Sequence, residues 1–316
     1  MSLLIGIDIG GTNLRLGVIK TSVGAQQLVE EMRFKADFSQ MCKAHSPEIA
    51  WQNILTTIAE AIQKVRQQYA DISAVGIGFP GFIHPHSQKI AQSPNLPGLK
   101  EVDLGADLSQ LIQLPVVVEN DALAAAYGEY ANQHFVQASN LIYLGLGTGV
   151  GGGLILNGQA FQGDHGVAME VGHIIVQANG RQCGCGNAGC MEQYASASGV
   201  VKTYFESTNQ QLHADEIAAL ASQGNLAALD AYALAGKSLA QALAHTLKVI
   251  DVKNIVIGGG MSAAWPLMKT AFQQQLRQDL IPVLRDKLTI TISSMGDQAG
   301  MIGAAMLAQQ KMRSLN

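Results

Sequence analysis

Three of the four cysteines, Cys183, Cys185 and Cys190, lie within eight positions of one another, and His173 stands ten residues upstream of the first. Thiolates and a neutral imidazole are donors that Zn²⁺ favours, and four of them complete a tetrahedral shell. Glycines between the cysteines permit a tight loop around one point. The spacing predicts a structural zinc site in the loop 173–190. A free-thiol loop or an oxidised cysteine pair is the alternative.

Polar side chains flank this loop. Glu170 lies three residues before His173, and Glu192 lies two residues after Cys190. A loop closed around a metal would hold these groups near one another. Carboxylates and an imidazole in one place suit the hydrogen-bonding demand of a polyhydroxylated ligand. An exposed acidic face is the alternative for Glu170 and Glu192.

A second candidate centre is the pair Asn120 and Asp121. It follows an apolar run, 116–119, and precedes an alanine-rich stretch, so it lies where a strand passes into a helix. Ligands of α/β proteins commonly bind at such carboxyl ends of strands. A carboxylate there can take a proton from a substrate hydroxyl. Helix capping is the alternative, because Asn and Asp are favoured N-caps.

Three glycine turns can bind phosphate. The turn Asp8–Thr12 and the turn Gly147–Gly149 each lead into a strand, so they do not match the strand-to-helix fingerprint of dinucleotide-binding proteins. Their N–H groups can form an anion nest, and Asp8 could hold the Mg²⁺ of a nucleotide. The turn Gly258–Gly260 precedes a helix, where an anion is also stabilised. Plain tight hairpins and close strand–helix packing are the alternatives.

Alternating strands and helices must position these residues. We expect strands over 3–9, 14–18, 27–35, 72–79, 116–119, 140–146, 150–156, 254–257 and 288–293. We expect helices over 47–69, from about 120, across most of 192–250, after 260, and over 298–312. Ser46 and Pro47 are a plausible N-cap and first residue of one helix. The order predicts an α/β architecture.

A short internal sequence repeat indicates that the two halves of the chain are duplicated domains. Gly17 follows Thr12 by five positions, and Gly153 follows Thr148 by the same interval. Each half therefore carries a strand, a glycine–threonine turn and a second strand. The pattern predicts two related α/β domains with a cleft between them. Chance similarity of glycine-rich turns is the alternative.

Composition narrows the function classes. The net charge is −4, which argues against a general nucleic-acid binder. The first residues lack the basic segment of a secretory signal, Asp8 interrupts their apolar run, and no stretch is long and apolar enough for a bilayer span. We therefore expect a cytoplasmic protein that associates with neither membranes nor nucleic acid.

The motifs resemble those of the ROK family of sugar kinases, in the hexokinase and actin-like ATPase superfamily. The resemblance runs over nearly the whole chain and is carried by Asp8–Thr12, Gly78–Gly81, Glu119–Ala122, Leu146–Gly153, Glu170–His173, Cys183–Glu192 and Ile257–Gly260. It implies the two-lobed actin-like (ribonuclease H-like) fold, with duplicated α/β domains around a central cleft. The small lobe would span 1–119, with a C-terminal helix at about 299–316 packing back on it, and the large lobe 120–298.

The resemblance also implies residue roles. Asp121 matches the catalytic base, and the sugar hydroxyls would be bound by Asn120, Asp121, Glu170, His173 and Glu192. The ATP phosphates and adenosine would be held by Asp8, Gly10, Gly11, Thr12, Asn13, Gly147, Thr148, Gly149, Gly258, Gly259 and Gly260. The zinc ligands would be His173, Cys183, Cys185 and Cys190. The implied cofactors are ATP, Mg²⁺ and structural Zn²⁺, and the implied assembly is a homodimer or homotetramer.

The expected reaction is phosphorylation of a hexose at its 6-hydroxyl, as in glycolytic carbohydrate metabolism. The segments Ser93–Gly98 and Val116–Asp121 look like the glucokinase branch, which favours glucose. N-acetylglucosamine, N-acetylmannosamine and fructose are the alternative substrates. A non-catalytic sugar sensor and an NAD-dependent oxidoreductase are alternatives of other classes. The ROK repressors carry an N-terminal helix-turn-helix domain, for which we expect no room before the first strand.

Overall fold

The computed structural model describes residues 2–10, 13–22, 25–93, 96–132 and 139–314, and the chain divides into two compact units. The first unit consists of Met1–Ser139, Gly153–Ala168 and Asp297–Asn316, and the second consists of Asn140–Gly152 and Met169–Gly296. Among the described helices, none is long and apolar enough to span a membrane. The lobe boundaries expected from the resemblance, 1–119 with about 299–316 and 120–298, stay a prediction.

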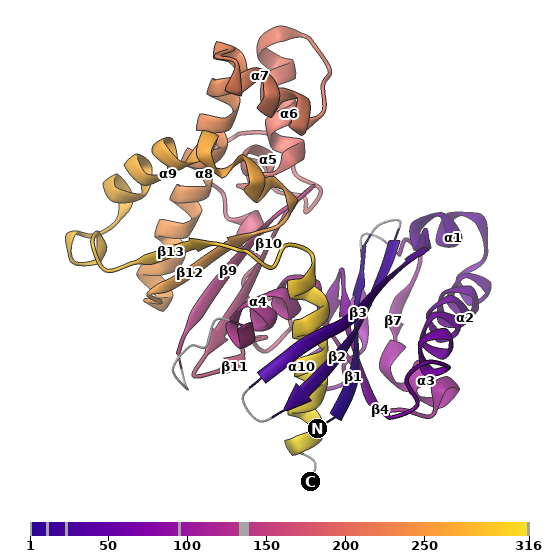
Figure 1. The fold of residues 1–316 in the computed structure, drawn as a ribbon. Coiled ribbons are helices and arrows are strands. Elements are labelled where there is room, and N and C mark those ends of the chain that lie inside the picture. The colour runs from indigo at the N-terminus through magenta and orange to yellow at the C-terminus, as the bar shows by residue number, and fades with distance from the viewer. Residues whose placement is uncertain (1, 11–12, 23–24, 94–95, 133–138, 315–316) are drawn as a thin grey trace. The chain divides into compact units, whose positions relative to one another are not determined.

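The first unit is built on a five-stranded sheet of order β3-β2-β1-β4-β8 (Figure 1). β1 pairs antiparallel with β2 and parallel with β4, and β4 pairs parallel with β8. β5, β6 and β7 form a small antiparallel sheet. The elements are β1 (Ser2–Ile9), β2 (Asn13–Ser22), β3 (Ala25–Lys35), α1 (Phe38–Ala44), α2 (Pro47–Arg66), β4 (Ile72–Phe79), β5 (Phe82–Ile83), β6 (Ile90–Gln92), β7 (Lys100–Val102), α3 (Leu104–Ile112), β8 (Val116–Asn120), α4 (Asp121–Asn132), β11 (Gln159–Ala160) and α10 (Gln298–Ser314).

The two faces of this sheet differ in composition. Large apolar side chains such as Ile7 and Ile77 belong to the buried core that includes Ile58 of α2. Successive side chains of a strand alternate between faces, so the opposite face includes Gly6 of β1 and Gly76 of β4. A Cβ at Gly6 or Gly76 would overlap the backbone of α10. The C-terminal helix therefore lies directly on the backbone of β1 and β4.

A second five-stranded sheet, three of whose strands lie wholly in the second unit, repeats the same pattern. It has the order β11-β10-β9-β12-β13, in which β9, β12 and β13 run parallel and β10 pairs antiparallel with β11. In both sheets the hairpin strands lie on one side of the first strand and the parallel strands on the other. This likeness confirms the expected duplication, and the two mixed sheets form the two-lobed actin-like fold.

Helices make up most of the rest of the second unit (Figure 1). Its elements are β9 (Leu141–Leu146), β10 (Val150–Leu156), η1 (Val171–His173), α5 (Glu192–Ala195), α6 (Ala197–Thr208), α7 (Ala214–Ser222), α8 (Leu226–Ile250), β12 (Asn254–Gly258), η2 (Gly260–Ala264), α9 (Trp265–Asp279), η3 (Pro282–Leu284) and β13 (Thr289–Ile292). The α/β architecture expected from the alternating pattern is confirmed.

Two local expectations needed adjustment. The helix expected over 47–69 begins at Pro47 after the N-cap Ser46, as predicted, but ends at Arg66. Beyond it the hydroxyl of Tyr69 donates to the Glu30 carboxylate of β3 at 2.8 Å, which draws the chain away from the helix axis. The helix expected after residue 260 is preceded by the 3₁₀ turn η2 and begins only at Trp265.

Candidate functional site

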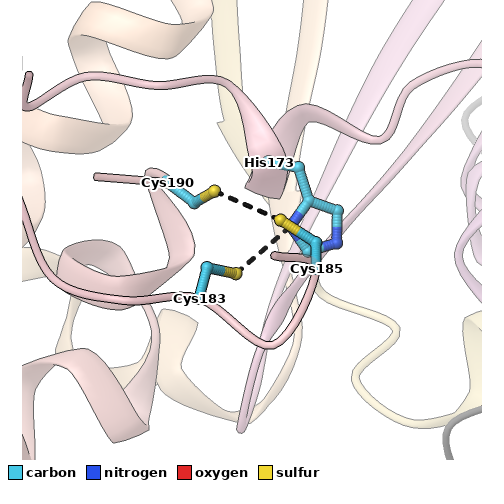
Figure 2. Close-up of side chains that lie close together, drawn as sticks. All are labelled: His173, Cys183, Cys185 and Cys190. Atoms are coloured by element: carbon cyan, nitrogen blue, oxygen red, sulfur yellow. Dashed lines mark hydrogen bonds between the residues drawn. The ribbon is translucent and has the colours of Figure 1, made fainter. Parts of the chain in front are cut away.

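The four expected metal ligands lie together in the second unit (Figure 2). One donor atom from each of His173, Cys183, Cys185 and Cys190 falls within 4.8 Å of all the others. Nδ1 of His173 is 3.6 Å from Sγ of Cys183, and Sγ of Cys185 is 3.6 Å from Sγ of Cys190. A tetrahedral zinc with bonds of about 2.3 Å separates its sulfur ligands by roughly 3.7 Å. The cluster therefore fits a zinc ion.

Backbone hydrogen bonds fold the cysteine loop. Gly186 N–H donates to the carbonyl of Cys183 at 3.1 Å, and Cys183 N–H donates to the carbonyl of Asn187 at 2.9 Å. Gly186 and Gly189 take φ values of 97° and 87°, a region that disfavours residues with a Cβ. These glycines are the sequence feature that lets three thiols converge.

The surroundings shift the pKa values of the three clustered thiols in different directions. Burial raises the pKa of Cys183, and burial with the neighbouring cysteines raises the pKa of Cys190 to about 12. In the exposed Cys185 the pKa is lowered, chiefly by the N–H of Asn187. All four cysteines of the chain are free thiols, so the oxidised-pair alternative is not realised. Because metal binding deprotonates thiols, a divalent cation would let the buried pair ionise.

Two expected sugar ligands, Glu170 and Glu192, lie on either side of the imidazole of a third, His173. Oε1 of Glu192 lies 3.9 Å from Nδ1 of His173 and accepts from the Cys183 thiol at 3.3 Å. On the opposite side of the ring, Oε2 of Glu170 lies 3.7 Å from Nε2. Glu170 is the N-cap residue of η1, whose last residue is His173, so a single turn sets their spacing. The zinc ligands and the two carboxylates thus form one cluster.

The glycine turn between β9 and β10 lies beside this cluster. Gly147 N–H donates to the carbonyl of Gly149 at 2.9 Å, and the Gly147 carbonyl accepts from Ala197 N–H at 2.9 Å. A Cβ at Gly149 would stand 2.9 Å from Oε2 of Glu192. Thr148 is exposed at the tip of the turn. An expected phosphate turn therefore contacts an expected sugar ligand within one unit.

The third glycine segment packs closely. A Cβ at Gly258 would meet the Tyr143 ring, and one at Gly259, whose φ is 79°, would overlap the backbone of Leu146. At Gly260 no atom lies within 4 Å of such a Cβ. The packing alternative accounts for the first two glycines, and Gly260 stays open toward a ligand.

In the first unit, one row of the sheet collects charged residues. Asp8 pairs with Arg15 of β2 and with Gly78 of β4, and Gly78 pairs with Glu119 of β8. Asn120 and Asp121 follow Glu119 at the carboxyl end of β8. The parallel strands β1, β4 and β8 therefore bring Asp8 and the Asn120–Asp121 pair to the same edge.

Two hydrogen bonds hold the side chain of Asn120 in place at this edge of the sheet. Its Oδ1 accepts from the N–H of Leu123 at 3.0 Å, and its Nδ2 donates to the carbonyl of Gly81 at 3.1 Å. The capping alternative is thus realised for Asn120. An amide nitrogen has two hydrogens, so capping and ligand binding are compatible. Oδ1 of Asp121 accepts from the N–H of Ala122 at 2.8 Å.

Burial dominates the acid–base properties of both aspartates. It raises the pKa of Asp121 against the pull of nearby backbone N–H groups. Burial, and next the charge of Asp121, raises the pKa of Asp8 to about 7, while Arg15 opposes the shift. Arg15 also pairs with Asp297, which lies just before α10. A divalent cation beside Asp8 would restore its carboxylate, so the site suits Mg²⁺.

The N-terminal turn is described in part. Gly10 N–H donates to the carbonyl of Asn13 at 2.9 Å, and both residues are exposed. Gly11 and Thr12 lie outside the described residues. Asn120 and Asp121 belong to the first unit, and the ligand cluster around His173 belongs to the second. Their meeting around one sugar stays a prediction.

Sequence reasoning missed the buried carboxylic acid of Glu119. The residue is 6% exposed. Its carboxylate accepts from Asn120 N–H at 2.8 Å and from Nε2 of Gln162 at 2.6 Å. Burial raises its pKa to about 7, against these two bonds and a weaker pull from Lys311. The signal was a charged residue at a core position of an otherwise apolar strand.

Known proteins resemble this chain over nearly its whole length. The profile of the ROK family matches residues 4–311. The chain is 31% identical to a glucokinase of Streptomyces coelicolor, over 98% of each chain. It is 34% identical to an N-acetyl-D-glucosamine kinase of Shigella boydii, over 96% of this chain and 98% of that one. The structure of a Streptomyces griseus ROK glucokinase with glucose and AMPPNP superposes with a TM-score of 0.81 at 30% identity, over 98% of this chain and all of the other.

Proposed function

Since the chain belongs to the ROK family of sugar kinases, we propose that it transfers the γ-phosphoryl group of ATP to the 6-hydroxyl of a hexose, preferably glucose. The observation that carries this proposal is the cluster of Glu170, His173 and Glu192 around the cysteine site. Carboxylates on both sides of one imidazole offer the acceptors and donors that sugar hydroxyls need.

Asp121 is the proposed general base. In the reaction the sugar oxygen forms a bond to phosphorus, the bond to the leaving ADP breaks, and the hydroxyl proton passes to the Asp121 carboxylate. Its raised pKa supports the role, because it brings the carboxylate's proton affinity closer to that needed near neutral pH. Asn120, fixed by its bonds to Leu123 and Gly81, would use its remaining amide hydrogen on a neighbouring sugar hydroxyl.

The glycine turns would hold the phosphates through backbone N–H groups. The position of Gly149 beside Glu192 supports this role, because the phosphate donor and the sugar must meet. Asp8 would hold the magnesium ion that accompanies the nucleotide. Catalysis of phosphoryl transfer consists mainly of such positioning and charge stabilisation.

The cysteine loop would act on the sugar indirectly. Nδ1 of His173 faces the thiols and Nε2 faces Glu170, so the ring can serve a metal with one nitrogen and the sugar with the other. When bound, zinc supplies rigidity and positive charge to the loop that carries Glu192. The site is therefore structural in its chemistry.

Glucose is preferred over N-acetylglucosamine on two grounds. The segments Ser93–Gly98 and Val116–Asp121 resemble the glucokinase branch, and the Streptomyces griseus relative was solved with glucose. The 34% identity to an N-acetyl-D-glucosamine kinase supports that sugar as the second candidate.

An ADP-release assay with Mg-ATP tests the proposal. The acceptors are glucose, N-acetylglucosamine, N-acetylmannosamine, mannose and fructose, and the phosphorylated carbon is assigned by NMR of the product. We expect glucose to give a kcat/KM about tenfold or more above the others, which corresponds to about 1.4 kcal/mol of transition-state discrimination. A preference for an acetylated sugar would overturn the glucose assignment, and no turnover with any sugar would overturn the kinase proposal.

A further inference from the structure

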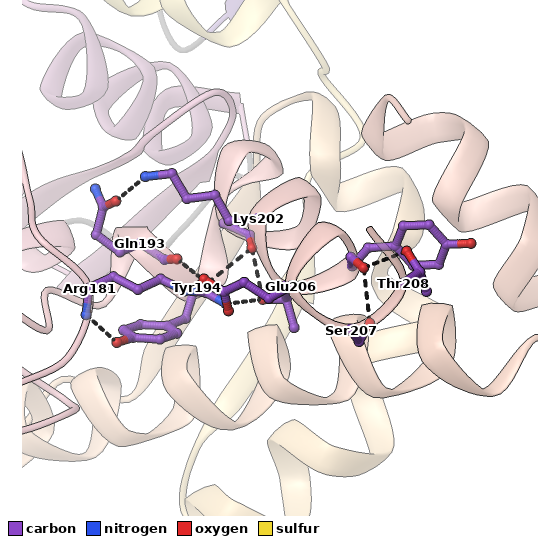
Figure 3. A network of polar contacts seen from close by, with 10 residues as sticks. Arg181, Gln193, Tyr194, Lys202, Glu206, Ser207 and Thr208 are labelled. Atoms are coloured by element: carbon purple, nitrogen blue, oxygen red, sulfur yellow. Dashed lines mark hydrogen bonds and ion pairs between the residues drawn. The ribbon is translucent and has the colours of Figure 1, made fainter. Parts of the chain in front are cut away.

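Arg181 stands two residues before Cys183 and uses its whole guanidinium group within the second unit (Figure 3). Nε and Nη2 donate to the two carboxylate oxygens of Glu206 at 3.1 and 2.6 Å. Nη2 also donates to Oγ1 of Thr203 at 3.0 Å. Nη1 donates to the carbonyls of Gln193 at 2.7 Å and Gly199 at 3.2 Å. These five bonds match the five N–H donors of an arginine.

Tyr194 completes the attachment of Arg181. The Tyr194 hydroxyl accepts from the backbone N–H of Arg181 at 2.8 Å, and the guanidinium lies 4.7 Å from the centre of the ring. Gly180 is needed beside it, because a Cβ there would overlap the Tyr194 hydroxyl. Both the main chain and the side chain at Arg181 are therefore fixed against α5 and α6.

These contacts link the two ends of a short chain segment, 181–193. The bond from Arg181 to the Gln193 carbonyl joins the two ends of the segment that holds the three clustered cysteines and Glu192. Ser196 tightens the same junction, since its hydroxyl donates to the Glu192 carbonyl at 2.6 Å and accepts from Gly199 N–H at 3.0 Å. The segment is thus tied at its base by protein contacts and not only by its metal ligands.

The residues bonded through the Arg181 side chain differ in their exposure to solvent. The Arg181 side chain is 14% exposed, whereas that of Glu206 is 58% exposed. The ion pair is therefore at the solvent edge, where such pairs contribute little. The bonds to the Gln193 and Gly199 carbonyls lie on the protected side. A lysine lacks the planar fork, and its three donors on one nitrogen cannot replace all five bonds of Arg181.

From this arrangement we propose that Arg181 is a positioning residue, which clamps the cysteine loop to the start of α5 and so preorganises both the zinc ligands and Glu192. The consequence for sugar binding rests on the proposed function, and the consequence for zinc binding does not. Removing the clamp leaves every ligand in the chain but lets the loop open. Zinc must then supply the lost order, so its apparent affinity falls.

Arg181→Lys and the control Glu206→Gln test the proposal. The control removes the exposed charge and keeps an acceptor oxygen, and it leaves both carbonyl bonds possible. Zinc affinity is measured by competition with a chromogenic chelator, and sugar kinetics are measured at saturating zinc. We expect Arg181→Lys to weaken zinc binding and to raise the sugar KM by about tenfold or more each, because lysine keeps the charge but cannot remake the set of strong charge-assisted bonds that the arginine fork makes. We expect kcat to change by less than about threefold.

The outcomes are distinct. A purely structural role would lower the melting temperature of Arg181→Lys and leave zinc affinity and KM unchanged, which would overturn the proposal. Equal losses in Glu206→Gln would also overturn it, since the edge ion pair would then carry the effect. If wild type turns over no sugar, the proposed function fails while the zinc comparison still decides the clamp. Should Arg181→Lys not fold, Tyr194→Phe removes one bond and is expected to show the same losses in smaller measure.

Discussion

Replacing Glu119 by glutamine is expected to make the protein more stable at high pH. The carboxyl group is buried and its pKa is raised from 4.5 to about 7, chiefly by desolvation. The folded state therefore holds this proton more tightly than the unfolded state, and wild-type stability falls as pH rises from about 4.5 to about 7. The glutamine side chain has nearly the same shape and has no proton to lose. Its Oε1 can still accept from Asn120 N–H, and the Gln162 amide can reverse to pair with its amide nitrogen.

The pKa shift sets the size of the effect. A shift of about 2.5 pKa units, at 1.36 kcal/mol per unit, is about 3 kcal/mol. The variant and wild type should have equal stability near pH 4, where Glu119 is protonated in both states. By pH 8 the free energy of unfolding of the variant should exceed that of wild type by about 3 kcal/mol, and most of this difference should develop between pH 5 and 7.

Urea unfolding followed by circular dichroism at a series of pH values measures this difference. Other ionisable groups are common to both proteins, so their contributions cancel in the comparison. A gap that does not change with pH, or a variant less stable than wild type at pH 8, would refute the reasoning. It would mean that the bonds from Asn120 and Gln162 outweigh the burial of the charge.

Two other predictions concern packing and metal. Gly76→Ala would force a methyl group into the backbone of α10 at Ala304, so urea unfolding should show a loss of stability of about 1–3 kcal/mol or more. Gly260→Ala places its methyl group in open space and should change stability by less than about 0.5 kcal/mol. Equal effects of the two substitutions would contradict the close packing of α10 on β4. Removing zinc with a chelator should lower the melting temperature and raise the sugar KM, because the loop ligands lose their common centre. Metal analysis of native protein that finds no zinc would rule this out.

The sequence predicted the features that depend on short-range spacing. The three cysteines with His173, the carboxylates beside them, and the strand ends at Asp8 and Asn120 follow from local patterns. Glycines at fixed intervals revealed the duplicated hairpins, because a tight turn between two strands has few sequence solutions. The two sheets of like order confirm that interpretation.

Features that depend on long-range contacts were not predictable. Nothing near Arg181 indicates that its guanidinium reaches Gln193, Gly199 and Glu206, since these lie 12 to 25 positions away. The Glu119 carboxylate accepts a hydrogen bond from Gln162, which lies 43 positions later. The close seating of α10 depends on Gly6 and Gly76, which look like ordinary strand glycines until the helix above them is known.

The rate of phosphoryl transfer by Asp121→Asn tests the central claim most directly. Zinc-loaded wild type and variant are compared in the ADP-release assay with Mg-ATP and the best sugar, after circular dichroism has shown equal folding. The account predicts a kcat lowered by about 10²–10⁴, with a smaller change in KM, because asparagine keeps the shape but cannot accept the proton. A variant that retains more than about a tenth of the wild-type rate would contradict Asp121 as the general base.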